Sequence, residues 1–272
     1  MAYKVVALDL DGTLLDSRKC ISPRNLAALK AIQAKGLTLI IVSGRHHIAI
    51  RPYQVQAELS APTICCNGAY VYDFAGNRPV DASPLETAQA AAVAAIARRH
   101  RVWCSLYAED AILFEDGDPH HIGLRAWAET LPPALRPRLE QVEDCERQIA
   151  AEPVIWKCVL THPEPSVLRS CVDEMRSAAD LSYEWSWFDV VDVVQKGWTK
   201  GRRLAEWARR EGVAPEDILA VGDNHNDVSM LILAGTGVAM GNSDDAVKAH
   251  ADWVTASNDD DGVAVALRRF VL

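Results

Sequence analysis

Two aspartates, two residues apart, directly follow an apolar run near the start of the chain. The run is Val5-Val6-Ala7-Leu8, and the acids are Asp9 and Asp11. A buried strand that ends in acid, any residue, acid is costly to build without a cation, because unpaired buried charges are strongly disfavoured. This feature predicts metal-assisted chemistry in which a carboxylate acts as the nucleophile.

Strand and helix alternate through the first third of the chain. Apolar runs predict three strands, over 4–8, 37–42 and 62–66. Ser22 is a good N-cap for a helix that begins at Pro23, and a second helix is expected over 48–59. This order predicts an α/β fold, in which a parallel sheet carries helices on its faces.

The middle of the chain differs in composition from its two ends. Residues 83–189 contain 18 acidic and 10 basic residues and five of the eight tryptophans, although the whole chain has a net charge of only −9. Short strands and helices there predict an α+β module with a largely antiparallel sheet. Trp185 and Trp187 alternate on one of these strands, so we expect both indoles on one face. We therefore expect a host core of residues 1–82 and 190–272, with 83–189 as an inserted cap.

The alternation of strand and helix resumes near Val190, where Thr199 is the expected N-cap of a helix over 200–210. Four polar motifs then lie just past the carboxyl ends of predicted parallel strands, where open α/β sheets bind ligands. They are Asp9–Thr13, Ser43-Gly44-Arg45, Thr199-Lys200-Gly201 and Gly222–Asp227. Their convergence on one edge predicts a single polar site.

Asp9 and Asp11 are expected to point to the same side of the strand end. Gly12 allows a sharp turn that exposes backbone N–H groups to an anion such as phosphate. We assign Asp9 as the nucleophile that becomes an aspartyl-phosphate. Asp11 protonates the leaving oxygen and then deprotonates the water that hydrolyses the intermediate. The alternative is an aspartate turn capped by Thr13, but such a turn does not need two acids.

Asp223 and Asp227 bring two further carboxylates toward Asp9, and a hard cation such as Mg2+ relieves their repulsion. We assign Asp9, the backbone carbonyl of Asp11 and Asp223 as direct ligands. Asp227 is expected to hold the ligands in place without contacting the ion, or to be a ligand itself. The alternative, an acidic first helical turn, explains Asp227 but does not explain an acid at the end of a strand.

Phosphate contacts are expected from the other motifs. Ser43 and the N–H group of Gly44 can donate to a phosphate oxygen, although Ser-Gly is also a common turn at the start of a helix. Lys200 lies in a first helical turn that favours anions, although most lysines are simply solvated. Asn226 is placed either to bind phosphate or to orient Asp9, and is also a common N-cap.

Three neighbouring features have simpler interpretations. Arg45, His46 and His47 follow the Ser-Gly pair and could reach an anionic substrate, but we interpret these histidines as surface or helix-start residues. Asn67-Gly68 is interpreted as a turn, although it lies at the same edge of the sheet and could touch the substrate.

Composition argues against several partners. The net charge of −9 argues against nucleic acid, and no apolar run approaches the roughly 20 residues of a membrane-spanning helix. A strand that begins at Lys4 leaves no room for a signal peptide. Seven scattered cysteines without a C-x-x-C pair are typical of a reduced, cytoplasmic protein. We expect a small phosphorylated metabolite as partner, and no membrane or obligate protein partner.

The four motifs, in this order, resemble those of the haloacid dehalogenase-like phosphatases, and more narrowly the Cof-type branch with a class IIB cap. The resemblance covers nearly the whole chain, and includes Cys66–Ala69 and Gly237–Asn242. It implies a Rossmann-like core with an inserted α+β cap, a nucleophile and an acid/base at Asp9 and Asp11, and Mg2+ held by Asp9, Asp11 and Asp223. The phosphate contacts that it implies are the Leu10 backbone, Ser43, Gly44, Lys200 and Asn226.

Several stretches, among them Gly44–Ile50 and Glu184–Trp187, also resemble a bacterial pyridoxal phosphate phosphatase. We therefore expect a Mg2+-dependent phosphomonoester hydrolase that acts on pyridoxal 5′-phosphate, on sugar phosphates or on both. The same residues would serve a phosphotransferase or phosphomutase, which only its products would reveal. A non-catalytic metabolite sensor is a third hypothesis, although a pure binder gains nothing from a nucleophile and an acid.

Overall fold

A computed structural model describes residues 3–272; Met1 and Ala2, on which the expectation about a signal peptide partly rests, lie outside it. The chain forms two compact units. The first contains the chain up to Ser43, Tyr53–Val80 and Thr199–Leu272, and the second contains Gly44–Pro52 and Asp81–Trp198. Between residues 3 and 272, no helix combines the length and the apolar composition that crossing a bilayer requires.

A five-stranded parallel sheet forms the centre of the first unit. Its strand order is β14-β13-β12-β1-β2. The strands are β1 (Val5–Leu8), β2 (Thr38–Ile41), β12 (Ile218–Gly222), β13 (Thr236–Ala239) and β14 (Trp253–Val254). From β1 the chain continues to β2 at one edge, whereas from β12 it continues through β13 to β14 at the other edge. The carboxyl ends of β1 and β12 therefore form a topological switch point. The predicted parallel α/β core is confirmed.

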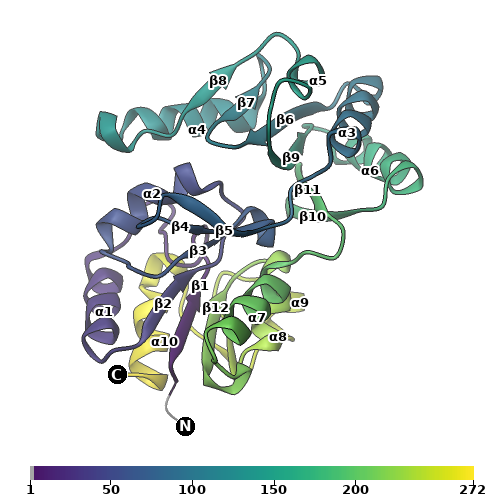
Figure 1. The fold of residues 1–272 in the computed structure, drawn as a ribbon. Coiled ribbons are helices and arrows are strands. Elements are labelled where there is room, and N and C mark those ends of the chain that lie inside the picture. The colour runs from purple at the N-terminus through teal and green to yellow at the C-terminus, as the bar shows by residue number, and fades with distance from the viewer. Residues whose placement is uncertain (1–2) are drawn as a thin grey trace. The chain divides into compact units, whose positions relative to one another are not determined.

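Helices cover both faces of this sheet. Figure 1 shows α1 (Pro23–Ala34) and α10 (Gly262–Phe270) on one face, and α7 (Lys200–Arg210) and α8 (Val228–Leu233) on the other. The short helix α9 (Asp245–Lys248) lies between β13 and β14 in the sequence. Alternate side chains of β1, beginning with Val5, join the apolar cluster that includes Leu204 and Trp207 of α7.

Both predicted N-caps are present. Ser22 Oγ accepts a hydrogen bond from the backbone N–H of Asn25, and Thr199 Oγ1 accepts one from the backbone N–H of Arg202. The helices α1 and α7 therefore begin where the sequence indicates. The cap at Thr199 fixes the first turn of α7, which carries Lys200.

The strand predicted over 62–66 leaves the parallel sheet almost at once. β3 (Thr63–Cys65) forms one isolated parallel bridge, between Ile64 and Val42, the residue that follows β2, and it pairs antiparallel with β4 (Tyr70–Asp73). β5 (Arg78–Ala82) completes a separate three-stranded sheet. β4 and β5 were not predicted, because neither is a long apolar run, and β4 pairs with β3 across the tight turn at Cys66–Gly68.

A six-stranded sheet forms the centre of the second unit, in the order β10-β11-β9-β6-β7-β8. The strands are β6 (Trp103–Ala108), β7 (Ile112–Phe114), β8 (Leu139–Gln141), β9 (Ile155–Thr161), β10 (Leu181–Trp187) and β11 (Val190–Gln195). Neighbours are antiparallel except for β7 and β8. The predicted α+β module with a largely antiparallel sheet is confirmed.

The structure differs from the expected return of the core pattern at Val190. β11 pairs antiparallel with both β10 and β9, so it belongs to the six-stranded sheet, and the first unit resumes only at Thr199. The segment Val190–Val194 is rich in valine, which suits a strand in either kind of sheet. Only the long-range pairing decides which sheet it joins.

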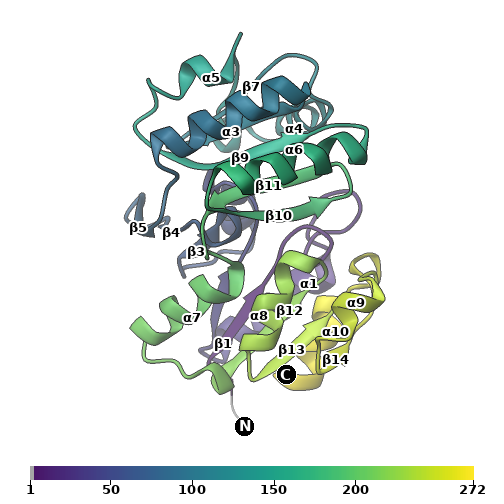
Figure 2. The ribbon, with the colours of Figure 1, turned by 90° about the vertical axis from the view of Figure 1, so that its right-hand side faces the viewer.

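The two faces of the six-stranded sheet have different characters. The helices α3 (Thr87–His100) and α6 (Pro165–Ala178) lie side by side on one face, as Figure 2 shows, and α5 (Cys145–Gln148) joins them there. That face is apolar. Side chains alternate along a strand, so Tyr107, Lys157 and Asp192, whose neighbours belong to the apolar cluster, point to the opposite face. The remaining helix is α4 (Pro119–Glu129).

Trp185 and Trp187 do not share a face, contrary to the expectation. The pairing of β10 with β11 shifts its register between these two residues. Trp185 packs against the apolar cluster, whereas Trp187 is 58% exposed. A bulge interrupts the alternation that the expectation assumed.

Residues 44–52 pack with residues 81–198 and so belong to the second unit, although they directly follow Ser43 of the first unit. The helix α2 (His47–Gln56) begins in this segment. His47 starts the helix as expected, but neither histidine lies on the surface: His46 is fully buried, with Nε2 2.7 Å from the carbonyl oxygen of Ala108. Burial lowers the pKa of His46 well below its ordinary value and that of His47 to about 3, so both are neutral.

Candidate active site

The strand register brings three of the motifs to the same edge of the parallel sheet. Leu8 of β1 pairs with Val221 of β12 and with Ile41 of β2. The residues that come next on these strands are Asp9, Gly222 and Val42, the last of them followed by Ser43. The motif residues therefore meet at the switch point beside β1, where a doubly wound sheet binds its ligands.

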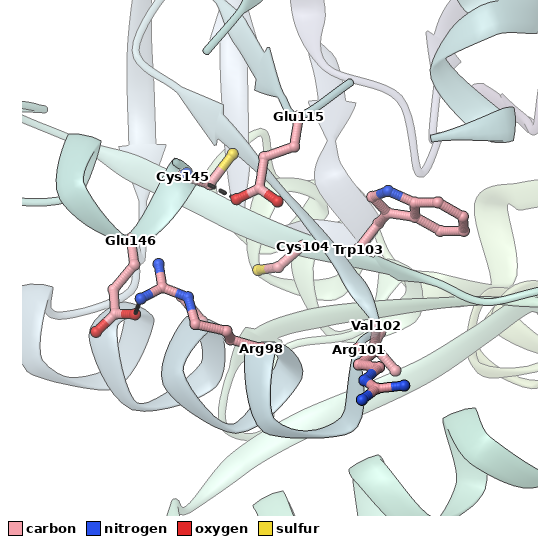
Figure 3. Close-up of a pocket in the computed structure, with 9 residues that line it drawn as sticks. Arg98, Arg101, Val102, Trp103, Cys104, Glu115, Cys145 and Glu146 are labelled. Atoms are coloured by element: carbon pink, nitrogen blue, oxygen red, sulfur yellow. Dashed lines mark hydrogen bonds and ion pairs between the residues drawn. The ribbon is translucent and has the colours of Figure 1, made fainter. Parts of the chain in front are cut away.

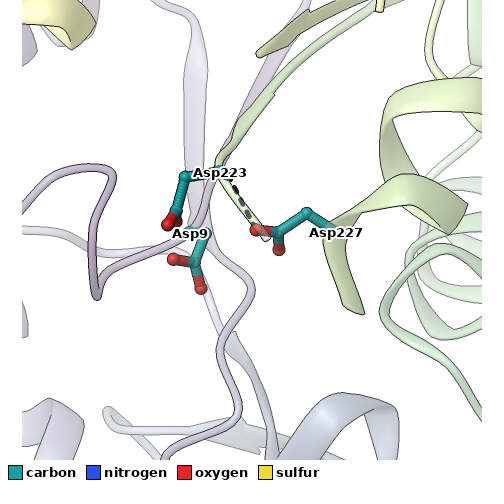
Figure 4. A group of neighbouring side chains, drawn as sticks. All are labelled: Asp9, Asp223 and Asp227. Atoms are coloured by element: carbon teal, nitrogen blue, oxygen red, sulfur yellow. Dashed lines mark hydrogen bonds between the residues drawn. The ribbon is translucent and has the colours of Figure 1, made fainter. Parts of the chain in front are cut away.

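Three carboxylates gather at this point. Oxygen atoms of Asp9, Asp223 and Asp227 lie within 4.8 Å of one another, and Figure 4 shows the three side chains converging from the ends of β1 and β12 and from the turn that follows β12. Asp9 is 4% exposed and Asp227 is fully buried. Carboxylates at this spacing repel one another strongly in a site of low dielectric constant. The cluster therefore requires positive charge.

Lys200 supplies part of that charge. Its Nζ donates to Asp9 Oδ1 at 2.7 Å and to Asp227 Oδ1 at 2.6 Å, and its side chain is 1% exposed. Burial alone would lower the pKa of this ammonium, but the charges of Asp227 and Asp9 raise it above its ordinary value. The lysine is therefore a permanently charged member of the site, not a solvated surface residue.

One ammonium does not balance three carboxylates. Burial, which Lys200 only partly offsets, raises the pKa of Asp9 from 3.8 to about 7. Burial and the charges of Asp9 and Asp227 raise the pKa of Asp223 from 3.8 to about 8. The side chain of Asp9 has one hydrogen bond among the described residues, from Lys200, and that of Asp223 has one, from Thr13. One oxygen of each carboxylate is thus available, and an all-oxygen donor set suits Mg2+.

Asp227 has a different position in the cluster. Its Oδ1 accepts from Lys200, and its Oδ2 accepts from the backbone N–H groups of Asp223 and Asn224 at 2.9 and 3.0 Å. Both oxygens are engaged, so this carboxylate fixes the turn that presents Asp223 and holds the lysine. The geometry favours the supporting role for Asp227 over direct ligation.

Asp11 lies outside the group of three carboxylates. Its Oδ1 accepts from Lys19 Nζ at 2.7 Å, and its side chain is 30% exposed. A partly exposed carboxylate that is paired with a partly exposed lysine is better suited to transferring protons than to binding a metal ion tightly. Lys19 was not identified from the sequence, which offers no signal for it beyond its position eight residues after Asp11.

Gly12 is required by its surroundings. Its φ is +79°, and a Cβ there would lie 2.3 Å from Asp223 Oδ2. The chain therefore turns directly against the carboxylate, and the hydroxyl of Thr13 donates to Asp223 Oδ1 at 2.8 Å. From the sequence, Thr13 was expected only as the cap of a turn, whereas in the structure its hydroxyl binds Asp223. Leu10, between the two acids, is fully buried and its carbonyl accepts from the N–H of Thr13.

Ser43 and Asn226 are connected through Asn67. The backbone N–H of Asn67 donates to the carbonyl of Ser43 at 3.1 Å, and Asn67 Oδ1 accepts from Asn226 Nδ2 at 3.1 Å. Asn67 has a φ of 55° and is 1% exposed. A buried, left-handed asparagine that links two candidate phosphate contacts is more than a turn residue. Its signal in the sequence was its place at the edge of the sheet.

The Cys66–Gly68 turn is also fastened to α7. Arg203 is fully buried, and its guanidinium donates to the carbonyls of Gly68 and Ala69 at 2.7 and 3.1 Å. At Gly201 a Cβ would lie 2.1 Å from the carbonyl oxygen of Ser229, so α7 approaches α8 closely. These contacts fix α7, and with it Lys200, against the turn that contains Asn67 and against α8.

Gly44 makes its contacts within the second unit, where its carbonyl accepts from Lys157 Nζ at 2.8 Å. The structure thus brings together Asp9, Asp223, Asp227 and Lys200 in one ion cluster, and connects Ser43 with Asn226 in a hydrogen-bonded chain.

A cavity of about 290 Å³ in the second unit is unrelated to these motifs. Figure 3 shows its lining, which includes Arg98, Glu115 and Glu146. Arg98 pairs with Glu146 at 2.9 Å, and Glu115 accepts from the backbone N–H of Cys145 at 2.9 Å. None of the four motifs contributes a residue to its lining.

Comparisons with known proteins agree on one family. Residues 6–267 match the family model described as haloacid dehalogenase-like hydrolase. The pyridoxal phosphate phosphatase YbhA of Escherichia coli is 41% identical over 264 residues, covering 97% of each chain. The 5-amino-6-(5-phospho-D-ribitylamino)uracil phosphatase YitU of Bacillus subtilis is 31% identical over 98% of this chain and 97% of its own. A solved structure of a subclass IIB sugar phosphatase superimposes with a TM-score of 0.82, at 27% identity over 98% of both chains.

Proposed function

The chain belongs to the haloacid dehalogenase-like hydrolases and is a phosphatase, and we propose that it hydrolyses pyridoxal 5′-phosphate by way of an aspartyl-phosphate on Asp9. Sugar phosphates are the second substrate class that we propose. The observation that supports the chemistry best is the buried cluster of Asp9, Asp223, Asp227 and Lys200 at the end of β1.

Hydrolases of this family generally use Mg2+, and the available oxygens of Asp9 and Asp223 fit such an ion. We propose that Asp9, the backbone carbonyl of Asp11 and Asp223 hold it, while Asp227 supports them through Lys200 and the turn. When bound, Mg2+ neutralises the repulsion between the carboxylates and the phosphate and polarises a phosphoryl oxygen.

The two chemical steps use Asp9 and Asp11. In the first, an oxygen of Asp9 forms a bond to phosphorus, the ester P–O bond breaks, and Asp11 gives its proton to the leaving oxygen. In the second, Asp11 takes a proton from water, the water oxygen attacks phosphorus, and the bond from phosphorus to Asp9 breaks. The partial exposure of Asp11 supports this role, because the water that it deprotonates in the second step must reach it from solvent.

Phosphate binding is proposed for the groups around the nucleophile. Lys200 balances the charge of Asp9 and of the incoming phosphate, with help from the first turn of α7. Ser43, the Gly44 N–H group, the Leu10 backbone and Asn226 would contact the phosphate oxygens. Asn226 Oδ1 is buried and accepts no hydrogen bond from residues 3–272, so the arrangement leaves polar capacity for a ligand.

The substrate assignment rests on the relatives rather than on the phosphate site, which every phosphate ester shares. YbhA, named for pyridoxal phosphate, matches 97% of this chain, and the solved sugar phosphatase supports the second class. All seven cysteines are free thiols and six of them are buried, which supports a reducing compartment such as the cytoplasm.

The test is turnover of a panel of phosphate monoesters by the full-length protein, with free phosphate and the dephosphorylated product both quantified. We expect hydrolysis of pyridoxal 5′-phosphate that EDTA abolishes and Mg2+ restores. Asp9→Asn should lose activity by at least about a thousandfold, whereas Asp173→Asn, at an exposed acid of the second unit, should not. Activity that survives chelation or the Asp9 substitution would contradict the mechanism, and a new phosphosugar in place of free phosphate would indicate a transferase.

A further inference from the structure

Lys157 is a buried lysine that the chemistry above does not use. It lies on β9 and is 3% exposed, and its Nζ donates to Asp192 Oδ1 at 2.7 Å. Asp192 Oδ2 in turn accepts from the hydroxyl of Ser186 at 2.8 Å. The ammonium also lies 4.4 Å from the centre of the Tyr107 ring. Buried lysines are rare unless they are paired, and Asp192 provides that pairing here.

The third partner of Lys157 connects this buried pair to the Ser43-Gly44 motif. Its Nζ donates to the carbonyl oxygen of Gly44 at 2.8 Å. The carbonyl belongs to the peptide bond that follows Gly44. The peptide bond that precedes Gly44 is fixed as well, because the carbonyl of Ser43 accepts from the N–H of Asn67.

Two planar peptide groups that are both fixed leave little freedom to the glycine between them. A trans peptide points its C=O and N–H groups in opposite directions, so the bond from Asn67 to Ser43 also directs the Gly44 N–H. Glycine is otherwise the most flexible residue of a chain. A hydrogen bond from a charged donor, such as the Lys157 ammonium, is stronger than one from a neutral donor, so it fixes the Gly44 carbonyl firmly.

We propose that Lys157 is a positioning residue for phosphate binding: the Lys157–Asp192 pair fixes the carbonyl of Gly44, and thereby the turn that presents the Gly44 N–H group to the phosphate. The inference rests on the proposed function, since it takes Gly44 as a phosphate contact. Lys157 acts through the backbone, so its effect is the same for every phosphate ester, whatever the organic group.

Three variants test the inference. Lys157→Met removes the ammonium and keeps the length of the side chain, but leaves Asp192 buried without its partner. The double variant Lys157→Met/Asp192→Leu removes both charges, so it recovers stability while the bond to Gly44 stays absent. Lys196→Met is the matched control, because Lys196 pairs with Asp180 in the same unit but is exposed.

Calorimetry measures the affinity for inorganic phosphate in the presence of Mg2+. Steady-state kinetics give KM and kcat for pyridoxal 5′-phosphate and for p-nitrophenyl phosphate. Thermal unfolding measures the stability of each variant. We expect both Lys157 variants to bind phosphate about ten- to a hundredfold more weakly, with the same rise in KM for both substrates. The double variant should unfold at a higher temperature than the single one, and Lys196→Met should match the wild type throughout.

Recovery of phosphate affinity together with stability in the double variant would show that Lys157 is merely structural, and would overturn the inference. A KM that changes for only one of the two substrates would overturn it too, because it would mean contact with the organic group. Since calorimetry needs no turnover, a wild-type protein that binds phosphate without hydrolysing any ester would refute the proposed function and still allow the inference to be judged.

Discussion

Lys200 Nζ lies 2.7 Å from Asp9 Oδ1, and the two side chains are only 1% and 5% exposed. The pair joins residues 191 positions apart in the sequence and ties the first turn of α7 to the end of β1. The same ammonium holds Asp227, so one cation serves two carboxylates from two other motifs.

Lys200→Met should therefore cost both stability and activity. Removal of the ammonium leaves Asp9 and Asp227 as buried, uncompensated charges, a change that typically destabilises by about 3–5 kcal/mol. Urea unfolding with EDTA present measures this loss, and added Mg2+ should recover part of it. Lys30→Met, at an exposed lysine paired with Glu58, is the control and should leave unfolding and turnover unchanged. If Lys200→Met unfolded at the same urea concentration as the wild type, this would contradict the charge balance described for the cluster.

Metal removal should make stability depend on pH. Without a cation, the folded pKa values of Asp9 and Asp223, about 7 and about 8, lie above their unfolded values near 3.8. Between these limits the folded state binds more protons than the unfolded state, so stability falls as pH rises from about 4 to about 8. Urea midpoints in EDTA should decrease across this range, and saturating Mg2+ should flatten the dependence. A stability that rises with pH in EDTA would refute these raised pKa values.

Asp11→Asn should reveal its role through the leaving group. An amide cannot protonate an alkoxide, so hydrolysis of alkyl phosphates should fall by about two to four orders of magnitude. p-Nitrophenolate needs no proton, so formation of the aspartyl-phosphate from p-nitrophenyl phosphate should be affected much less. The intermediate should then accumulate, because water is no longer deprotonated, and intact-mass spectrometry would detect it. Equal losses for both leaving groups would argue against Asp11 as the general acid.

Asn67 offers a test that separates backbone strain from hydrogen bonding. Asn67→Gly relaxes the left-handed backbone and removes the acceptor of Asn226, so phosphate affinity should weaken while stability changes little. Asn67→Ala should weaken affinity equally and lose about a further 1–2 kcal/mol, since alanine does not tolerate a positive φ. Calorimetry and urea unfolding give the two quantities. Unchanged phosphate affinity in both variants would reduce Asn67 to a turn residue.

Local chemistry made much of the first unit predictable. The runs that became β1, β2 and β12 are apolar apart from Thr38 at the start of β2, as expected for strands buried on both faces, and Ser22 and Thr199 mark where their helices begin. The acids at the ends of these strands could be assigned to one edge because parallel strands share a direction. Both roles predicted for Asp227, as a support of the ligands or as a ligand itself, stay predictions, and its bonds to Lys200 and to two backbone N–H groups favour the first.

What could not be predicted depends on contacts between distant segments. β11 has the composition of a core strand but pairs with β10 and β9. His46 and His47 read as polar helix-start residues, yet they are buried by strands more than 50 positions away, as the bond from His46 to Ala108 illustrates. Lys19, Thr13 and Asn67 are single polar residues whose importance arises only when the fold brings Asp11, Asp223 and Asn226 beside them.

The assignment of residues 44–52 to the second unit has a practical consequence for protein engineering. The backbone crosses between the units four times, not twice, so the module cannot be excised as one continuous piece. A chimaera that transplants only residues 81–198 onto a related scaffold would leave behind Gly44 and His46, the native partners of Lys157 and of the Ala108 carbonyl. Successful exchange of specificity between relatives should require that the short segment after Ser43 travels with the larger insert.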